Sequence, residues 1–452
     1  MELSGTPMNK RPALIFAGCI TAIFGIIQTG TTQTSNQKIG PNDRERAKTM
    51  LADMRDTVKK HYYDPTFHGI DMDARYKTYK DRVEKAETLA DAFRTVAAYM
   101  AGLDDSHTFF IPPNRSYRSE YGYRIQMVGD ACFITQIRPE TDAAQKLHLG
   151  DQVISLNGFG VNRKDFWQLD YFLHQLAPKP ASDFTLRSPS GTIRKEEVLT
   201  KYIQGKRLKD LTFDHGDTDL YSLIFEEDKE MRLLRSRYIE QNDVLIWKLP
   251  AFVQNDSEVD HMMGVARKHK ALIVDLRDNP GGQEVTLNRM IGNVFDHDVK
   301  VGSRLTRKGE KPMVARSRGD AAFAGELVVL IDSNSASASE LFARVIQVEH
   351  RGKVVGDRSS GSVMEAYHYQ FQAGADIAVF YAASVTGADL VMTDGKSLEK
   401  RGVTPDVIVL PTPEDVANSR DPALAKAAEL VGVKIDSTAA GKMFPFEWIP
   451  LS

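Results

Sequence analysis

Two near-continuous apolar runs in the second half of the chain limit most strongly what it can fold into. They are Ala271–Leu276 and Leu327–Ile331, and helical patterns follow both. Strands without polar alternation are typical of a sheet that is buried on both faces. Because strands that alternate with helices indicate an α/β fold, the sequence predicts an α/β core over residues 204–412.

Three further regions flank this core. Residues 43–114 carry apolar side chains at helical spacing, which predicts a helical region. Residues 115–203 contain short strand patterns with one helix near Phe166–Leu176, as in a compact β-rich module. Residues 413–452 form a tail in which we expect one helical stretch, Ala423–Leu430, and little else.

The first 30 residues have the pattern of an export signal. Lys10 and Arg11 precede an apolar run of 15 residues, 13–27. A signal peptide has this charged start and apolar middle, and a spanning helix needs about 18 apolar residues or more. We therefore expect a secreted or periplasmic protein, with a linker over residues 31–42; a membrane tether through residues 13–27 is the alternative.

Charge and cysteine content exclude several classes of function. The 58 Lys and Arg residues against 61 Asp and Glu give a net charge of −3, and no long basic run is present. Nucleic acid is therefore not an expected partner. Cys19 and Cys132 alone cannot build a disulfide framework or a thiolate metal site, and we expect Cys132, in an apolar run, to be buried and inert. No metal-site or phosphate-loop motif is found, so we expect no cofactor.

Two motifs in the predicted core could carry acyl-transfer chemistry. The segment Asp332–Glu340 (DSNSASASE) stands between a predicted strand and a helix, so a serine in it would lie at a helix N-terminus, where developing negative charge is stabilised. Gly281 and Gly282 follow the other strand and could supply oxyanion donors. The alternatives are purely structural: Ser337 and Glu340 have capping-box spacing, and two glycines can form an ordinary turn.

A third motif lies between the helical region and the β-rich module. Leu103–Phe110 (LDDSHTFF) contains Ser106 and His107, in a place where loops commonly carry function. His107 is a candidate general base. The alternative is a histidine held by local hydrogen bonds, with Asp105 or Ser106 as a cap.

In their order along residues 43–411, these motifs resemble the C-terminal processing (tail-specific) serine peptidases and the related tricorn core protease. The resemblance also rests on Gly402–Asp406 (GVTPD). It implies a ClpP/crotonase-like serine peptidase core, and a PDZ-like fold for the β-rich module, most recognisable at Gly150–Gly158 (GDQVISLNG). It makes Ser337 the nucleophile.

The chain departs from the processing peptidases at the base. Ser362 stands where that family has its lysine, so a Ser/Lys dyad is absent. The tricorn type instead uses a Ser-His pair and a later glutamate, which Ser106, His107 and Glu399 match. The resemblance thus implies that Glu399, through Ser106, orients His107. The alternative for Glu399 is a solvated surface residue.

The resemblance assigns the remaining site residues. Ala338 and either Gly281 or Gly282 would donate to the oxyanion, and Gly122 with Arg124 would stand where a PDZ-like module receives a polypeptide C-terminus. The expected function is an exported serine endopeptidase that acts on polypeptides and selects them by their C-terminus. The alternative is an inactive homologue that binds peptides or hydrophobic ligands. Catalysis requires Ser337 and His107 to meet within hydrogen-bond reach.

Overall fold

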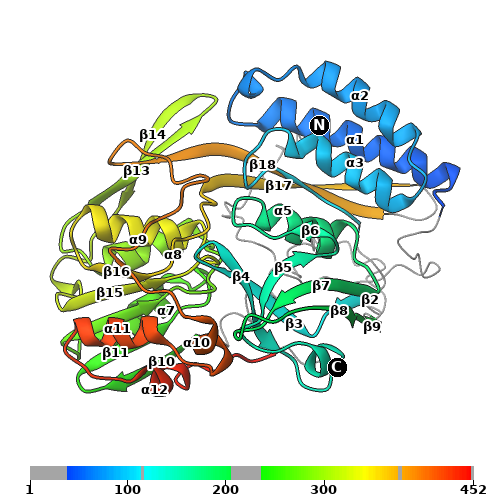
Figure 1. The fold of residues 1–452 in the computed structure, drawn as a ribbon. Helices are drawn as coiled ribbons and strands as arrows, with labels where there is room; N and C mark the ends of the chain where they lie inside the picture. The colour runs from blue at the N-terminus through cyan, green and yellow to red at the C-terminus, as the bar shows by residue number, and fades with distance from the viewer. Residues whose placement is uncertain (1–37, 114–116, 205–235, 375–378, 449–452) are drawn as a thin grey trace, which may run out of the picture.

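The structure is a computed structural model that describes residues 38–113, 117–204, 236–374 and 379–448 (Figure 1). The expected export segment, 13–27, lies outside these residues. Among the helices in the described ranges, none combines the length and the apolar character that crossing a bilayer requires.

The predicted α/β core contains a six-stranded sheet in the order β10-β11-β12-β15-β16-β19. β10 pairs antiparallel with β11, and the other pairs are parallel. Both apolar runs that predicted buried strands lie in its centre, where every residue of β12 is buried. The strands are β10 (Arg237–Gln241), β11 (Val244–Lys248), β12 (Ala271–Asp275), β15 (Glu326–Ile331), β16 (Lys353–Gly356) and β19 (Val407–Ile408).

Helices cover both faces of this sheet, as its apolar strands require. One face packs against helices α7 (Asp256–Ala266), α8 (Glu284–Gly292) and α9 (Ala338–Val348), near the short η3 (Gly319–Ala321). Helices of the C-terminal region, drawn in red in Figure 1, cover the other face.

The C-terminal region is more ordered than the sequence predicts. It forms three helices, α10 (Pro413–Ala417), α11 (Pro422–Leu430) and α12 (Ser437–Gly441). Leu424 and Ala427 of α11 are buried against the strands. The expectation of one helix and little else was wrong because helices of five residues are too short to show a periodic apolar pattern.

A second, antiparallel sheet links the core to the helical region. Its order is β1-β18-β13-β14, and β17 also pairs with β18. The three long N-terminal helices share one hydrophobic core with β17 and β18, and Figure 1 shows them beside these two strands. The elements are α1 (Pro41–His61), η1 (Phe67–Gly69), α2 (Met72–Glu84), α3 (Leu89–Ala101), β1 (Phe109–Ile111), β13 (Val299–Thr306), β14 (Gly309–Ala315), β17 (Met364–Ala373) and β18 (Val379–Met392).

The β-rich module has its own core and sheet, in the order β3-β4-β5-β7-β8, with β6 beside β5 and a separate β2-β9 ribbon. Cys132 lies in that core, and burial raises the pKa of its thiol to about 12, as expected of an inert cysteine. The elements are β2 (Tyr117–Glu120), β3 (Tyr123–Val128), β4 (Ala131–Ile137), α4 (Ala143–Lys146), β5 (Gln152–Leu156), β6 (Phe159–Gly160), α5 (Phe166–Asp170), η2 (Tyr171–Leu176), β7 (Ala181–Arg187), β8 (Ile193–Leu199) and β9 (Lys201–Gln204).

Polar contacts join strand β3 and the turn after it to the core. Ser333 donates a hydrogen bond to the carbonyl of Met127 at 2.6 Å, and Gln126 donates to Asp332 at the same distance. The Gly129 N–H donates to Asp357 at 2.9 Å. The module therefore meets the core at the segment that leads to Ser337.

Candidate active site

Ser337 occupies a strained backbone position between β15 and α9. Its φ of +54° and ψ of −116° lie in a region that residues other than glycine rarely adopt. Its side chain is buried, and the Oγ atom has no hydrogen-bond partner among the described residues. The hydroxyl therefore does not cap helix α9, which was the structural alternative for this serine.

Glu340 holds the turn that carries Ser337. Its carboxylate accepts hydrogen bonds from the Ser337 N–H at 3.0 Å, the Ser359 hydroxyl at 2.6 Å, the Gly361 N–H at 2.7 Å and the Ser362 N–H at 2.9 Å. Burial raises the pKa of this carboxyl to about 7. The spacing of Ser337 and Glu340 predicts only a capping box, and this spacing is the only sequence signal of the larger role of Glu340.

Gly281 lies directly against Ser337. A Cβ atom placed on Gly281 would come within 2.7 Å of the Ser337 Cβ and 2.9 Å of the Ala338 nitrogen. Its own N–H donates to the Asn279 side chain at 2.8 Å. That N–H is therefore already engaged in this structure.

Ser106 connects His107 to Glu399. The Ser106 hydroxyl donates to Glu399 Oε2 at 2.9 Å and lies 2.7 Å from His107 Nδ1. Because that hydroxyl has a single proton, Nδ1 must carry its own proton and donate to Ser106. His107 Nε2 is then left with a free lone pair, which is the form a general base needs.

His107 is completely buried, at 0% exposure, and this burial lowers its pKa to about 3. The imidazole is therefore neutral near pH 7. The carboxylate of Asp105 fixes the surrounding turn, since its Oδ1 accepts from the His107 N–H at 2.9 Å and the Thr108 N–H at 2.6 Å. The local hydrogen bonds that formed the structural alternative thus hold the backbone, and the Nε2 atom has no partner among the described residues.

Glu399 faces the interior of the site. It also accepts hydrogen bonds from the Ser106 N–H at 2.8 Å and the Val363 N–H at 2.9 Å. Burial raises the pKa of its carboxyl to about 7. The neighbouring Lys400 pairs with Asp104 instead, so the solvated alternative for Glu399 does not hold.

The structure brings Ser337 and His107 into one network without a direct bond between them. The Ser337 N–H donates to the Ser362 carbonyl at 2.9 Å, and the next residue, Val363, donates to Glu399. The expected contact between Ser337 Oγ and His107 Nε2 is absent, since neither atom has a partner in the described structure. Catalytic hydrogen bonds are often long without substrate and tighten when it binds.

The two residues expected to receive a polypeptide end are already engaged. The Gly122 N–H donates to Glu120 at 2.9 Å. Arg124 makes a two-pronged ion pair with Asp278, at 2.9 and 2.8 Å. In this structure neither group is available to a terminal carboxylate.

Comparison with known proteins gives two domain matches. Residues 243–409 match the model of peptidase family S41, and residues 43–102 match the tricorn protease C1 domain. The tail-specific protease of Haemophilus influenzae is 24% identical over 323 residues, which cover 67% of this chain and 43% of that protein. A probable CtpA-like serine protease of Staphylococcus aureus is 26% identical over 243 residues, which cover 48% of this chain and 47% of that protein.

The chain thus spans less than half the length of either relative. Among solved structures, mature CPAF is similar with a TM-score of 0.61 and 15% identity over 83% of this chain and 94% of that one. The structure of mature CPAF complexed with lactacystin gives a TM-score of 0.58 at 14% identity, over 83% of this chain and 95% of that one. At these identities the likeness concerns the fold, and the similarity to peptidase family S41 rests on residues 243–409, which match its model.

Proposed function

We propose that this protein is a serine peptidase that hydrolyses polypeptides with Ser337, His107 and Glu399. The observation that carries the proposal is the Glu399–Ser106–His107 network, which leaves a lone pair on Nε2 of a buried, neutral imidazole. A protein that only binds peptides or serves as a scaffold does not require this arrangement. Peptide hydrolysis by a serine requires a base that activates the hydroxyl, and a neutral imidazole with a free lone pair is such a base.

In the proposed mechanism the Ser337 hydroxyl attacks the peptide carbonyl as its proton passes to His107 Nε2. The N–H groups of Ala338 and Gly282 stabilise the oxyanion, and each such donor contributes about 10²- to 10³-fold in rate. His107 then gives the proton to the leaving amine, and an acyl-enzyme remains. Water, deprotonated by the same imidazole, releases the product. Glu399 stabilises the imidazolium through Ser106.

The resemblance of the β-rich module to a PDZ-like domain supports selection of substrates by their C-terminus. Since the Gly122 N–H and the Arg124 guanidinium are engaged, binding at that loop would first require release of Glu120 and Asp278. Export is part of the proposal because of the apolar run 13–27 behind Lys10 and Arg11.

A second candidate is an inactive homologue that binds peptides. The missing bond between Ser337 and His107 favours it, because an inert site has no need of that contact. Hydrolysis of an unstructured polypeptide, such as reduced casein, separates the two. We expect Ser337→Ala to lower kcat/KM by about 10⁴-fold or more.

Ser339→Ala is the matched control, since Ser339 lies two residues away, is equally buried and donates to the Asn279 carbonyl. This control should retain most of the activity. Equal hydrolysis by the Ser337→Ala variant and the unmodified protein would reject the peptidase proposal.

A further inference from the structure

Two aromatic side chains of the C-terminal region cover two arginines of the β-rich module. The Phe446 ring lies 5.0 Å from the Arg124 guanidinium, and the Trp448 ring lies 4.8 Å from that of Arg138. Both distances are within the range of cation–π contacts. The intervening Glu447 pairs with Arg237. Residues Phe444–Trp448 are called the covering segment below.

Both arginines already have their charge neutralised. Arg124 pairs with Asp278, and Arg138 pairs with Glu120 at 3.3 Å, the residue that also accepts the Gly122 N–H. A neutralised guanidinium has little attraction left for a terminal carboxylate. Its flat face can still bind an aromatic ring, as the covering segment demonstrates.

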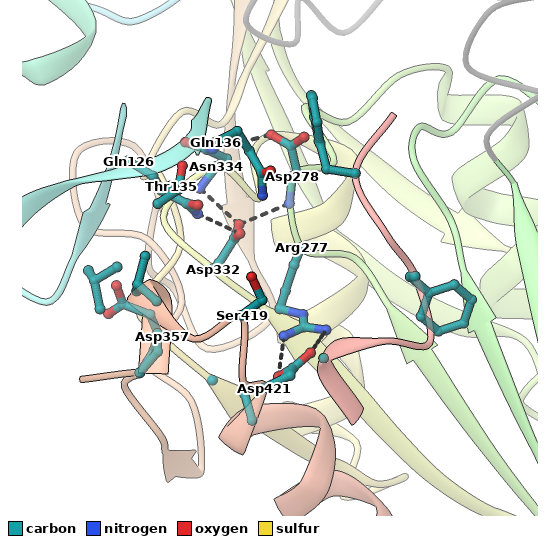
Figure 2. A pocket seen from close by; sticks show the side chains of 18 of the residues that line it. Gln126, Thr135, Gln136, Arg277, Asp278, Asp332, Asn334, Asp357, Ser419 and Asp421 are labelled. Atoms are coloured by element: carbon teal, nitrogen blue, oxygen red, sulfur yellow. Dashed lines mark hydrogen bonds and ion pairs between the residues drawn. The ribbon is translucent and has the colours of Figure 1, made fainter. Parts of the chain in front are cut away.

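The covering segment also closes one side of a cavity of about 500 Å³ between the module and the core. Strand β3 forms another side, and Figure 2 shows the Gln126 side chain and the Asp278 N–H directed at the Asp332 carboxylate there. Asp278 stands two residues before Pro280, at the turn that leads to Gly281. The segment therefore lies over a cavity that Asp278 and Asn334, from the two motif segments of the core, help to line.

We infer that Arg124 and Arg138 form a binding surface for aromatic side chains of an extended polypeptide, and that the covering segment occupies this surface within the same chain. The inference rests on the proposed function only in taking a polypeptide as the ligand. A substrate segment with two aromatic residues at alternate positions would bind by displacing Phe446 and Trp448.

Binding can be measured without catalysis in the Ser337→Ala variant. The probe is a fluorescent peptide with the sequence of residues 442–452 (KMFPFEWIPLS). Its binding is measured by fluorescence anisotropy. We expect tighter binding, by about tenfold, to a chain that lacks residues 445–452 than to the full chain. Replacing the peptide residues that correspond to Phe446 and Trp448 by alanine should weaken its binding about five- to thirtyfold, as the loss of two cation–π contacts implies.

Two variants test the surface itself. Phe446→Ala/Trp448→Ala in the full chain should uncover it as the deletion does, without shortening the chain. Arg124→Lys in the shortened chain keeps the charge that pairs with Asp278 but removes the flat guanidinium, so peptide affinity should fall. Arg318→Ala, an arginine that pairs with Asp260 elsewhere on the core, is the control and should bind normally.

Equal affinity of the full and shortened chains, or of the aromatic and alanine peptides, would overturn the inference. The thermal midpoint of each variant verifies that it folds. A failure of the proposed function would appear separately, as absent hydrolysis by the unmodified protein, because the binding assay uses a chain without the nucleophile.

Discussion

Replacing Glu399 by glutamine tests the relay that orients His107. A glutamine has one acceptor oxygen where Glu399 has two. If that oxygen takes the place of Oε2, the amide NH₂ faces the Ser106 N–H across the former 2.8 Å contact. If the NH₂ takes the place of Oε2, it donates to the Ser106 hydroxyl, which must then donate to His107 Nδ1. The Nε2 atom would carry the proton in that case and could not act as a base.

Both orientations lower the rate. The first loses a hydrogen bond to a charged group, worth about 1.5–3 kcal/mol, and the negative charge that stabilises the imidazolium. The second orientation reverses the tautomer of His107, and such a reversal lowers kcat by about 10⁴-fold in a comparable Ser-His-Asp triad. We therefore expect kcat to fall about 10²- to 10⁴-fold, while the fold is retained.

The same variant changes the pH dependence. Burial holds the pKa of Glu399 at about 7, and only its ionised form accepts all three hydrogen bonds. At pH 6 roughly a tenth of the molecules are ionised, so kcat/KM of the unmodified protein should rise about tenfold between pH 6 and pH 8. Glutamine does not titrate, so this part of the rise should disappear in the variant. Any rise of kcat/KM with pH that remains in the variant would report the ionisation of Glu340, whose pKa is also about 7.

The assay is hydrolysis of reduced casein between pH 5.5 and 8.5, with thermal unfolding of each variant in parallel. Glu349→Gln is the control, because Glu349 is exposed at the end of α9. An unchanged kcat and an unchanged pH profile in Glu399→Gln would refute the relay.

Three further predictions concern the support of the site. Gly281→Ala should abolish most hydrolysis, because its Cβ would lie 2.7 Å from that of Ser337, whereas Gly309→Ala, with a similar positive φ but open space around it, should retain activity in the casein assay. Arg277→Ala should lower the free energy of unfolding by about 3 kcal/mol in urea titrations, because it removes the guanidinium that pairs with the buried Asp275 carboxylate and leaves Lys248 as the remaining cation beside it; a loss below about 1 kcal/mol would contradict this. Glu340→Gln should lower both the thermal midpoint and kcat, since an amide NH₂ would face the N–H donors of Ser337 and Ser362. Unaltered values would show that the turn at Ser337 does not need the Glu340 carboxylate.

Much of the fold follows from local patterns in the sequence. The buried strands β12 and β15 are visible as apolar runs, and the β-rich module is visible as short alternating strands. The partners of these elements were harder to infer. Strand β18 pairs with β1 and with β17, and β17 and β18 pack against α1; such contacts between distant segments leave no periodic signal.

The candidate site shows the same limit. Ser106, His107 and Glu399 could be selected from their motifs, and the structure joins them by hydrogen bonds across 293 positions of the chain. The four donors to Glu340 and the engagement of Arg124 by Asp278 could not be predicted, because they depend on how loops from separate elements meet.

Labelling with a fluorophosphonate tests the central claim most directly, because this probe reacts only with a serine whose hydroxyl is activated by a base. Mass spectrometry of the digested protein should find the label on Ser337. The labelling rate should fall by at least about 10²-fold in His107→Ala, in line with the usual contribution of a general base. Absence of label, label on another serine, or an unchanged rate in that variant would contradict the account.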